Sequence, residues 1–165
     1  MQEDITACLN TTHPAERINL ILDTIQADIL VVDNKSAKKA EKLGFQGEII
    51  NLDELLEEYH GQAVDSEAQE RLGKIREQAL DTDPLYSIFT SGSTGVPKGV
   101  VITQSAVMNT VLDINQKFSI DNTDKIIGLS SMCFDLSVYD IFGSLSTGAK
   151  LVEMKISMIF HIWKE

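Results

Sequence analysis

The first part of the chain alternates between helical and extended patterns of apolar positions. Pro14 can stand in the first turn of a helix, and after it apolar residues recur at helical spacing on one face. These residues are Ile18, Ile21, Leu22 and Ile25. The continuous apolar run at 28–33, which charged residues bound, is typical of a strand covered on both faces. The pattern therefore predicts a helix that begins at Pro14 and is followed by a buried strand.

The alternation continues as far as residue 59. A short helix is predicted over 36–43, with Ser36 as its cap and Gly44 at its end. A second strand is predicted over 48–52, and a further helical stretch over 53–59. Helices and strands that alternate in this way indicate an α/β layer with a largely parallel sheet. We therefore expect an α/β fold with helices flanking the sheet.

Two segments do not follow this alternation. Residues 1–12 show no clear period, and we expect them to form a loosely attached lead-in. In the stretch 61–83, nine of the 23 residues are charged and apolar residues are sparse. This composition favours an exposed helix or a connecting arm.

The second half of the chain is predicted to contain strands at 85–89 and 100–102, then a helix from Thr103 to about residue 118. A turn at 121–124 precedes a strand at 125–130. A helix over 134–145 and a strand over 149–152 complete the pattern. The pattern assigns no element to the tail from Lys155 onward.

Charge and cysteine content narrow the possible partners. The 165 residues carry a net charge of −11, which argues against nucleic acids and anionic membranes, since both call for a basic surface. Cys8 and Cys133 have no metal-ligand or disulfide spacing, and no apolar run approaches the length of a membrane span. The acidic start of the sequence lacks the apolar core of a secretory signal. We expect a cytoplasmic protein without metal ligands.

The stretch 90–99, TSGSTGVPKG, is the richest in candidate chemistry. It holds three glycines, four hydroxyl residues and Lys98 between two predicted strands. Glycine allows the backbone to approach a ligand closely, and backbone N–H groups, hydroxyls and an ammonium can converge on phosphate oxygens. The stretch therefore predicts an anion-binding loop.

Two common nucleotide-binding loops do not fit it. Counted from Gly92, Lys98 stands where a Walker A lysine would, but Pro97 replaces the second glycine and Gly99 replaces the metal-binding hydroxyl. A strand also follows the loop where a helix is required. The dinucleotide-binding fingerprint fails as well, because Gly92 and Gly95 offer no G-x-G-x-x-G spacing.

Residues 86–100 instead resemble the phosphate-binding signature of the adenylate-forming (AMP-dependent synthetase/ligase) superfamily. Residues 130–143, with 148–152, are similar to the next core motif of the amino-acid adenylation domains of nonribosomal peptide synthetases. Residues 13–22 resemble the helix after the second core motif of these domains. The resemblance implies a partial adenylate-forming fold over 13–152, from the large N-terminal portion of the domain. It leaves an atypical lead-in at 1–12 and an atypical tail at 153–165.

The resemblance also implies roles for individual residues. The loop positions that match the ATP phosphate-binding loop are Thr90, Ser91, Gly92, Ser93, Thr94, Gly95 and Lys98. Asp135 matches the aspartate that pairs with the α-amino group of the amino acid, although without the motif it would be better explained as a helix N-cap. Leu136 and Tyr139 match residues that line the side-chain pocket, with Phe134 packed beneath them, and the combination suggests a cysteine-like substrate. ATP and Mg²⁺ are the cofactors of the intact family.

The later motifs of the family do not fit into the residues after 152. These motifs bind magnesium, adenine and ribose and carry the catalytic lysine, so we expect no catalytic residue within 1–165 and no activity from this chain alone. Three alternatives remain open. The chain can be half of a split synthetase completed by a separately encoded partner, a non-catalytic binding remnant, or part of another AMP-forming acyl ligase.

Overall fold

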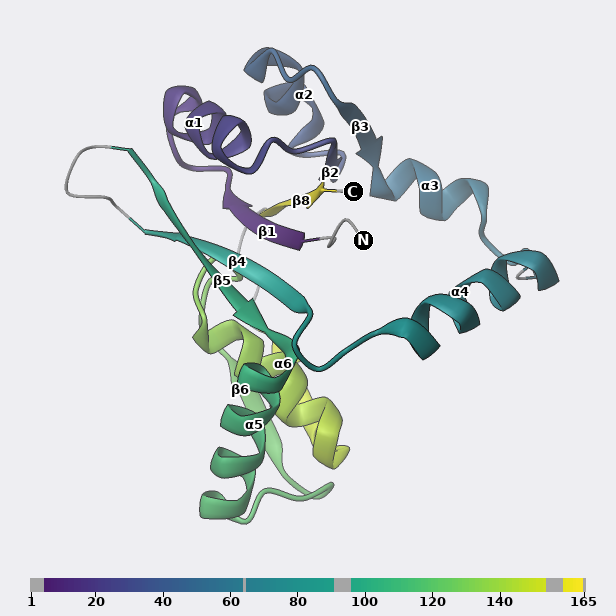
Figure 1. Cartoon of the computed structure of the whole chain (residues 1–165), viewed down its shortest axis with the longest axis vertical. Coiled ribbons are helices and arrows are strands. Elements are labelled where there is room, and N and C mark those ends of the chain that lie inside the picture. Colours follow the sequence, from purple (N-terminus) through teal and green to yellow (C-terminus); the bar gives the residue numbers. More distant parts are fainter. Residues whose placement is uncertain (1–4, 64, 91–95, 154–158, 165) are drawn as a thin grey trace.

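The computed structural model describes residues 5–63, 65–90, 96–153 and 159–164. Its strands form two sheets, one of six strands in the order β3-β2-β8-β1-β4-β5 and one that pairs β6 with β7 (Figure 1). The strands of the large sheet are β1 (Ile5–Asn10), β2 (Ile29–Val32), β3 (Glu48–Asn51), β4 (Pro84–Thr90), β5 (Lys98–Thr103) and β8 (Ile159–Lys164). The small sheet consists of β6 (Lys125–Gly128) and β7 (Lys150–Glu153). The helices are α1 (Ala15–Ile25), α2 (Ala37–Ala40), the 3-10 turn η1 (Glu41–Leu43), α3 (Leu52–Glu58), α4 (Ser66–Gln78), α5 (Gln104–Phe118) and α6 (Leu136–Thr147).

Four strands of the large sheet run in one direction and two in the other. β1 pairs parallel with β4, and β2 pairs parallel with β3. β8 lies between β1 and β2 and is antiparallel to both, so β1 to β4 share one direction. β5 returns antiparallel to β4 because the two strands form a hairpin. The expected α/β fold is confirmed, but the sheet is mixed and not mostly parallel, because two of its neighbouring strand pairs are parallel and three are antiparallel.

The core lies between α1 and the middle of the large sheet. The helix buries the apolar face predicted from its period, and each of its four core residues is at most 9% exposed. They pack with Ala7 and Leu9 of β1 and with Leu30 and Val32 of β2. At about 25 cal/mol per Å² of apolar surface removed from water, this layer is the main source of stability on that side of the sheet.

The expectation of a loosely attached lead-in is wrong for residues 5–10. They form β1, which pairs with β4 on one side and β8 on the other. Ala7 and Leu9 are each 1% exposed and face α1, which explains why this short segment is held in place. Whether 1–12 and 153–165 are atypical for the family stays a prediction.

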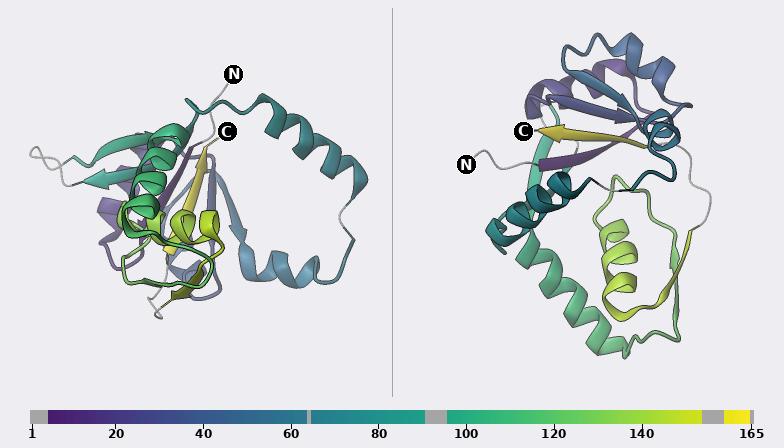
Figure 2. Two further views of the ribbon diagram at one scale, coloured as in Figure 1. Left: turned by 90° about the horizontal axis from the view of Figure 1, so that it is seen from below. Right: turned by 90° about the vertical axis from the view of Figure 1, so that its right-hand side faces the viewer.

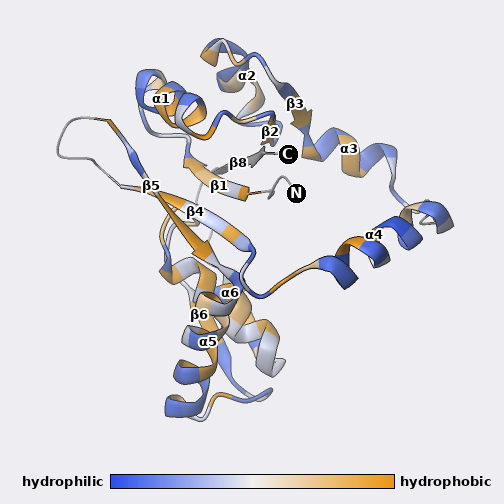
Figure 3. Cartoon of the chain, in the orientation of Figure 1, coloured by the Kyte–Doolittle hydropathy of each residue, from blue (hydrophilic) through white to orange (hydrophobic). Residues whose placement is uncertain are grey.

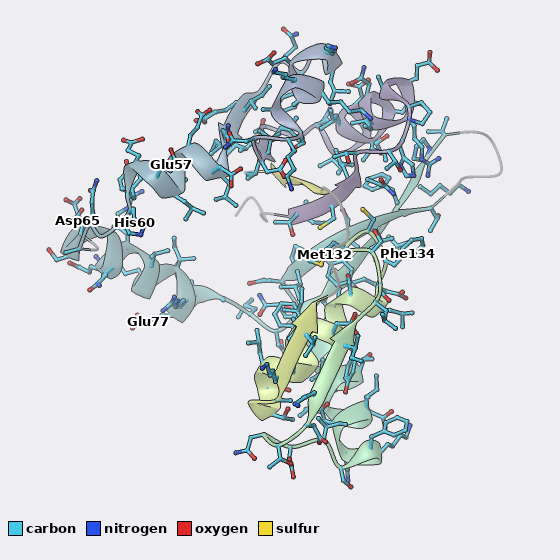
Figure 4. All side chains as sticks on the ribbon, turned by 180° about the vertical axis from the view of Figure 1, so that it is seen from behind. Glu57, His60, Asp65, Glu77, Met132 and Phe134 are labelled. Carbon is cyan, nitrogen blue, oxygen red and sulfur yellow. The ribbon has the colours of Figure 1, made fainter. Side chains whose placement is uncertain are left out.

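Helices α3 and α4 form an arm that extends to one side of the large sheet (Figure 2, left). Neither helix has a buried residue, and α4 is hydrophilic over most of its length (Figure 3). Glu57, His60, Asp65 and Glu77 all lie out on this arm (Figure 4). The prediction of an exposed helix or connecting arm over 61–83 is therefore confirmed for the described residues of that stretch.

The second half of the chain folds against the β4–β5 hairpin. Thr103 caps α5 by accepting a hydrogen bond from the backbone N–H of Ala106, as predicted. α5 packs on α6, and α6 covers one face of the β6–β7 pair. Gly148 ends α6 with φ +74°, a left-handed conformation that glycine adopts without strain. Among the described residues, no helix is long and apolar enough to cross a lipid bilayer.

Candidate functional site

The glycine-rich loop is the connection of the β4–β5 hairpin. Thr90, the last residue of β4, lies opposite Lys98, the first residue of β5. Its hydroxyl donates a 3.5 Å hydrogen bond to the Lys98 carbonyl oxygen. Three residues expected in the loop therefore belong to strands, Thr90 to β4 and Lys98 and Gly99 to β5. The other predicted phosphate ligands, Ser91, Gly92, Ser93, Thr94 and Gly95, lie outside the described residues.

Gly99 leaves room for an aromatic ring at the base of this hairpin. It pairs with Phe89, and a Cβ atom at this position would lie 3.0 Å from the Phe89 ring. Phe89 in turn packs against the core beneath α1. Because Gly99 has no side chain, the Phe89 ring can lie over it. The ring then connects the base of the loop to the core.

Lys98 presents its ammonium to solvent at the start of β5. The side chain is exposed, and within the described part of the chain it forms no ion pair. An exposed ammonium can bind a phosphate group, and this role of Lys98 stays a prediction.

Asp135 stands at the N-cap position of α6, but its side chain does not cap the helix. Its backbone is helical, with φ −58° and ψ −31°, and the carboxylate accepts no hydrogen bond from the first turn. The hydroxyl of Ser137 bonds back to the Phe134 carbonyl oxygen at 2.6 Å. The carboxylate of Asp135 is therefore left exposed and available to a ligand, which argues against a purely structural N-cap.

Two adjoining cavities connect the hairpin to α6. One, of about 300 Å³, has Thr90 and Asp135 in its lining. The other, of about 270 Å³, lies between α5 and α6 and has Asp135, Leu136 and Tyr139 in its lining. Tyr86, Ile102 and Asp135 line both cavities. One groove thus leads from the end of β4 past Asp135 to the predicted side-chain pocket.

Tyr86 also belongs to this site. It lies within the motif at 86–100, but no role was predicted for it from the sequence. Burial and, to a smaller extent, the charge of Asp135 raise the pKa of its phenol. The Tyr86 hydroxyl therefore keeps its proton at neutral pH and faces the same space as the carboxylate. The strand period contained this signal, because Tyr86, Ile88 and Thr90 alternate along β4 and share one face.

Tyr139 is held in place by Asn115. The Tyr139 hydroxyl donates a 2.9 Å hydrogen bond to the Asn115 side-chain oxygen. The Asn115 amide donates to the Gly143 carbonyl oxygen at 3.2 Å and to the Ser146 hydroxyl at 2.9 Å. Gly143 must be a glycine, since a Cβ atom there would lie 2.6 Å from the Tyr139 ring. The phenol is thus fixed against α5 and gives the pocket a defined wall.

The other two pocket residues are exposed. Leu136 lines the cavity between α5 and α6 and is 65% exposed, and its role in substrate binding stays a prediction. Phe134 was expected to pack beneath Leu136 and Tyr139, but it is 61% exposed and lines the neighbouring cavity (Figure 4). It precedes α6 by two residues, so the turn that starts the helix directs it toward the hairpin and not into the α5–α6 layer.

We expect Asn115→Leu to destabilise the fold by about 2–4 kcal/mol. The buried Asn115 links α5 to α6 through its three hydrogen bonds, and an isosteric apolar side chain leaves the partners on α6 without them. Urea unfolding followed by circular dichroism measures the loss. Asn109→Leu, an exposed position on the same helix, is the control and should change stability by less than about 0.5 kcal/mol. Equal stability of both variants would show that the network does not hold α6.

Other parts of the described chain contain a further cavity but none of the predicted site residues. A third cavity, of about 530 Å³, lies between α1 and residues 43–47 and shares no residue with the groove. No cluster of three or more His, Cys, Asp or Glu side chains suited to a metal ion occurs among the described residues. Burial raises the pKa of both thiols, that of Cys8 to about 12, so neither is a ready nucleophile at neutral pH.

Known proteins resemble this chain over most of its length. Residues 3–164 match the family described as AMP-binding enzyme. Bacitracin synthase 1 of Bacillus licheniformis is 57% identical over 90 residues, which are 53% of this chain and 2% of that protein. Surfactin synthase subunit 1 of Bacillus subtilis is 35% identical over 145 residues, which are 87% of this chain and 4% of that protein. The chain thus spans only a few per cent of these curated relatives.

A solved structure has a similar fold. The adenylation domain AlmE of Vibrio cholerae, in complex with glycyl-adenosine-5'-phosphate, has a TM-score of 0.69 and 26% sequence identity to this chain. The match covers 88% of this chain and 30% of AlmE. The chain therefore belongs to the AMP-binding enzyme family, and it corresponds to a part of an adenylation domain of the kind found in nonribosomal peptide synthetases.

Proposed function

We propose that this chain supplies the phosphate-binding loop and the amino-group carboxylate of a site that converts an amino acid and ATP into an aminoacyl-adenylate and pyrophosphate. One observation carries the proposal: Thr90, where the loop begins, and Asp135 line the same groove. In this proposal, the loop that begins at Thr90 contacts the phosphates of ATP, and Asp135 contacts the ammonium group of the amino acid.

The groups in this groove suit the reaction. A carboxylate oxygen of the amino acid attacks the α-phosphorus of ATP, and the bond from that phosphorus to the bridging oxygen of pyrophosphate breaks. Negative charge grows on the leaving β- and γ-phosphates, and we propose that Lys98 and the hydroxyls of the loop stabilise it. The resemblance to the phosphate-binding loop of the family adds further phosphate ligands, which are Ser91, Gly92, Ser93, Thr94 and Gly95. Magnesium would neutralise further charge when bound with ATP, and the described residues hold no cluster of their own for it.

Asp135 and the pocket beside it would select the amino acid. The exposed carboxylate pairs with the α-ammonium group, a charge-assisted contact that is stronger than a neutral hydrogen bond. The 270 Å³ cavity bounded by Leu136 and Tyr139 then receives the side chain. Because the combination of Asp135, Leu136 and Tyr139 resembles that of cysteine-activating domains, we propose a cysteine-like substrate.

The whole reaction needs more than these residues. The chain spans 30% of AlmE, so the rest of the domain must contribute the remaining contacts to ATP. We propose that this chain is inactive alone and acts when the rest of an adenylation domain joins it, as a separately encoded partner or as part of a longer chain. The cytoplasm, where ATP is available, is the location that we propose. A non-catalytic remnant is the alternative, and the experiment below separates the two.

Replacing Lys98 with alanine should weaken the binding of pyrophosphate or ATP by this chain about tenfold or more, which corresponds to roughly 1.4 kcal/mol. The loss is expected because the ammonium is the charged group at the base of the loop. Isothermal titration with pyrophosphate, and then with ATP and Mg²⁺, measures it. Lys74→Ala removes a lysine of the α4 arm, whose partner is Glu70, and should leave the affinity unchanged. Equal affinities for all three proteins would mean that the loop does not bind phosphate, as expected for a remnant.

A further inference from the structure

The small sheet leaves one apolar face open. In the β6–β7 pair, Ile126, Gly128 and Leu151 face α6, and a Cβ atom at Gly128 would contact Leu151 and Asp140. Because side chains alternate along a strand, Ile127 and Val152 point to the opposite face. They are 54% and 38% exposed, respectively. Seen from behind, no described helix or strand lies in front of this pair (Figure 4).

Such an arrangement is unusual for a finished fold. Parallel strands occur almost only in sheets whose two faces are both covered, and a sheet of two strands is marginally stable at best. Within the described residues, β6 and β7 pair only with each other, so each also presents an unpaired edge. Leu129, directly after β6, is 64% exposed and extends the apolar face.

Charged groups border the apolar face at one end. Lys125 of β6 and Lys150 of β7 are a register pair on the same face as Ile127 and Val152, and both are exposed. An occupant of this face therefore needs an apolar surface at the carboxyl end of the strands and acidic groups at the amino end. This combination fits a folded protein layer better than a lipid surface. A lipid surface does not present an apolar patch and an acidic patch side by side over the length of one strand.

The share of AlmE that this chain covers supports one choice of occupant. This chain matches AlmE over 88% of its own length but spans only 30% of AlmE, so most of that domain has no counterpart among these residues. We infer that the face formed by Ile127, Leu129 and Val152, with Lys125 and Lys150 at its border, is the surface on which the remaining part of an adenylation domain docks. The inference rests on the proposed function for the identity of the partner.

The test measures docking without nucleotide or amino acid. The probe is the part of the bacitracin synthase 1 adenylation domain that follows the stretch matched by this chain, co-expressed with the full chain and purified through a tag on the probe. Light scattering after size-exclusion chromatography should show a complex with one copy of each. Ile127→Asp should weaken binding at least tenfold, whereas Ile75→Asp, an exposed isoleucine on the α4 arm, should leave it unchanged.

A second variant guards against misfolding. If circular dichroism shows that Ile127→Asp is unfolded, the charge reversal Lys150→Glu tests the same face through an exposed side chain and should also weaken binding. Absence of a complex, equal binding by wild type and the folded variants, or a homodimer that occupies this face would each overturn the inference. Lys98→Ala should dock like wild type. Docking and activity can thus be separated. If the wild-type complex docks through this face but shows no amino-acid-dependent pyrophosphate exchange, the proposed function is refuted and the docking surface stands.

Discussion

Removal of residues 154–165 is expected to abolish cooperative folding of the large sheet. β8 lies between β1 and β2, and it is the strand that joins the pair β3-β2 to the group β1-β4-β5. All six of its residues pair with β1, and three of them, His161, Ile162 and Trp163, also pair with β2. At about 1 kcal/mol per backbone hydrogen bond, the loss is roughly 6 kcal/mol or more. That is comparable to the total stability of a typical domain, about 5–15 kcal/mol. Thermal unfolding followed by far-ultraviolet circular dichroism should lose its sharp transition.

A point variant tests the same claim without shortening the chain. Ile162 lies opposite Ala7 of β1 and Leu30 of β2, so Ile162→Pro removes a donor from the middle of the sheet. Ala63→Pro, in the exposed segment after α3, is the matched control and should unfold like wild type. Trp163 is the only tryptophan of the chain and belongs to β8, so its fluorescence should follow the same transition as the circular dichroism. A fluorescence transition well below the main one would show that β8 is not part of the sheet's cooperative unit.

Asp135→Ala is expected to raise the KM for the amino acid about 10- to 150-fold in the completed domain. A charge-assisted hydrogen bond contributes about 1.5–3 kcal/mol, which converts to a factor in this range. The KM for ATP should change little, because the proposed phosphate contacts come from the loop that begins at Thr90 and not from Asp135. The measurement is amino-acid-dependent exchange of pyrophosphate into ATP by the complex with the bacitracin synthase 1 part, or by a fusion of the two.

Asp23→Ala is the control for this prediction. Asp23 is an exposed carboxylate on α1 and lines neither cavity of the groove, so its removal should leave both KM values unchanged. An Asp135→Ala enzyme with a raised KM for ATP and an unchanged KM for the amino acid would contradict the assignment of Asp135.

The elements that could be predicted from the sequence are those whose signal is local. The apolar stripe of α1 has a helical period, and the run at 28–33 contains β2. The two strands beside the glycine-rich loop also appear as β4 and β5, although β5 begins at Lys98, inside the predicted loop. Each of these signals lies within one element and depends little on what packs against it.

The position of β1 and β8 could not be predicted in this way. β1 has only Ala7 and Leu9 as buried apolar residues, and polar residues beside them obscure the strand period. β8 is rich in strand-forming residues, but its place between β1 and β2 depends on which strand edges the rest of the chain leaves open. Pairing between the first and last segments of a chain leaves no trace in a local pattern.

In the candidate site, too, some residues could be predicted from the sequence and others could not. The motif resemblance placed Thr90, Lys98 and Asp135, and the structure brings Thr90 and Asp135 into one groove. Asn115 was not predicted, because a polar residue on a helix gives no sign that it bonds to a neighbouring helix. Such contacts depend on how α5 crosses α6, which the sequence pattern does not contain.

The most direct test of the central claim is pyrophosphate exchange by the completed domain with matched pairs of substrates. Each of the twenty amino acids, L-cysteine first, is compared with the acid that has the same side chain but lacks the α-amino group, which for cysteine is 3-mercaptopropionate. If Asp135 pairs with the ammonium group, the preferred amino acid should support exchange at least ten times faster than its deaminated counterpart at equal, subsaturating concentration. Equal rates, or faster exchange with aryl or fatty acids, would contradict the account and favour an acyl ligase.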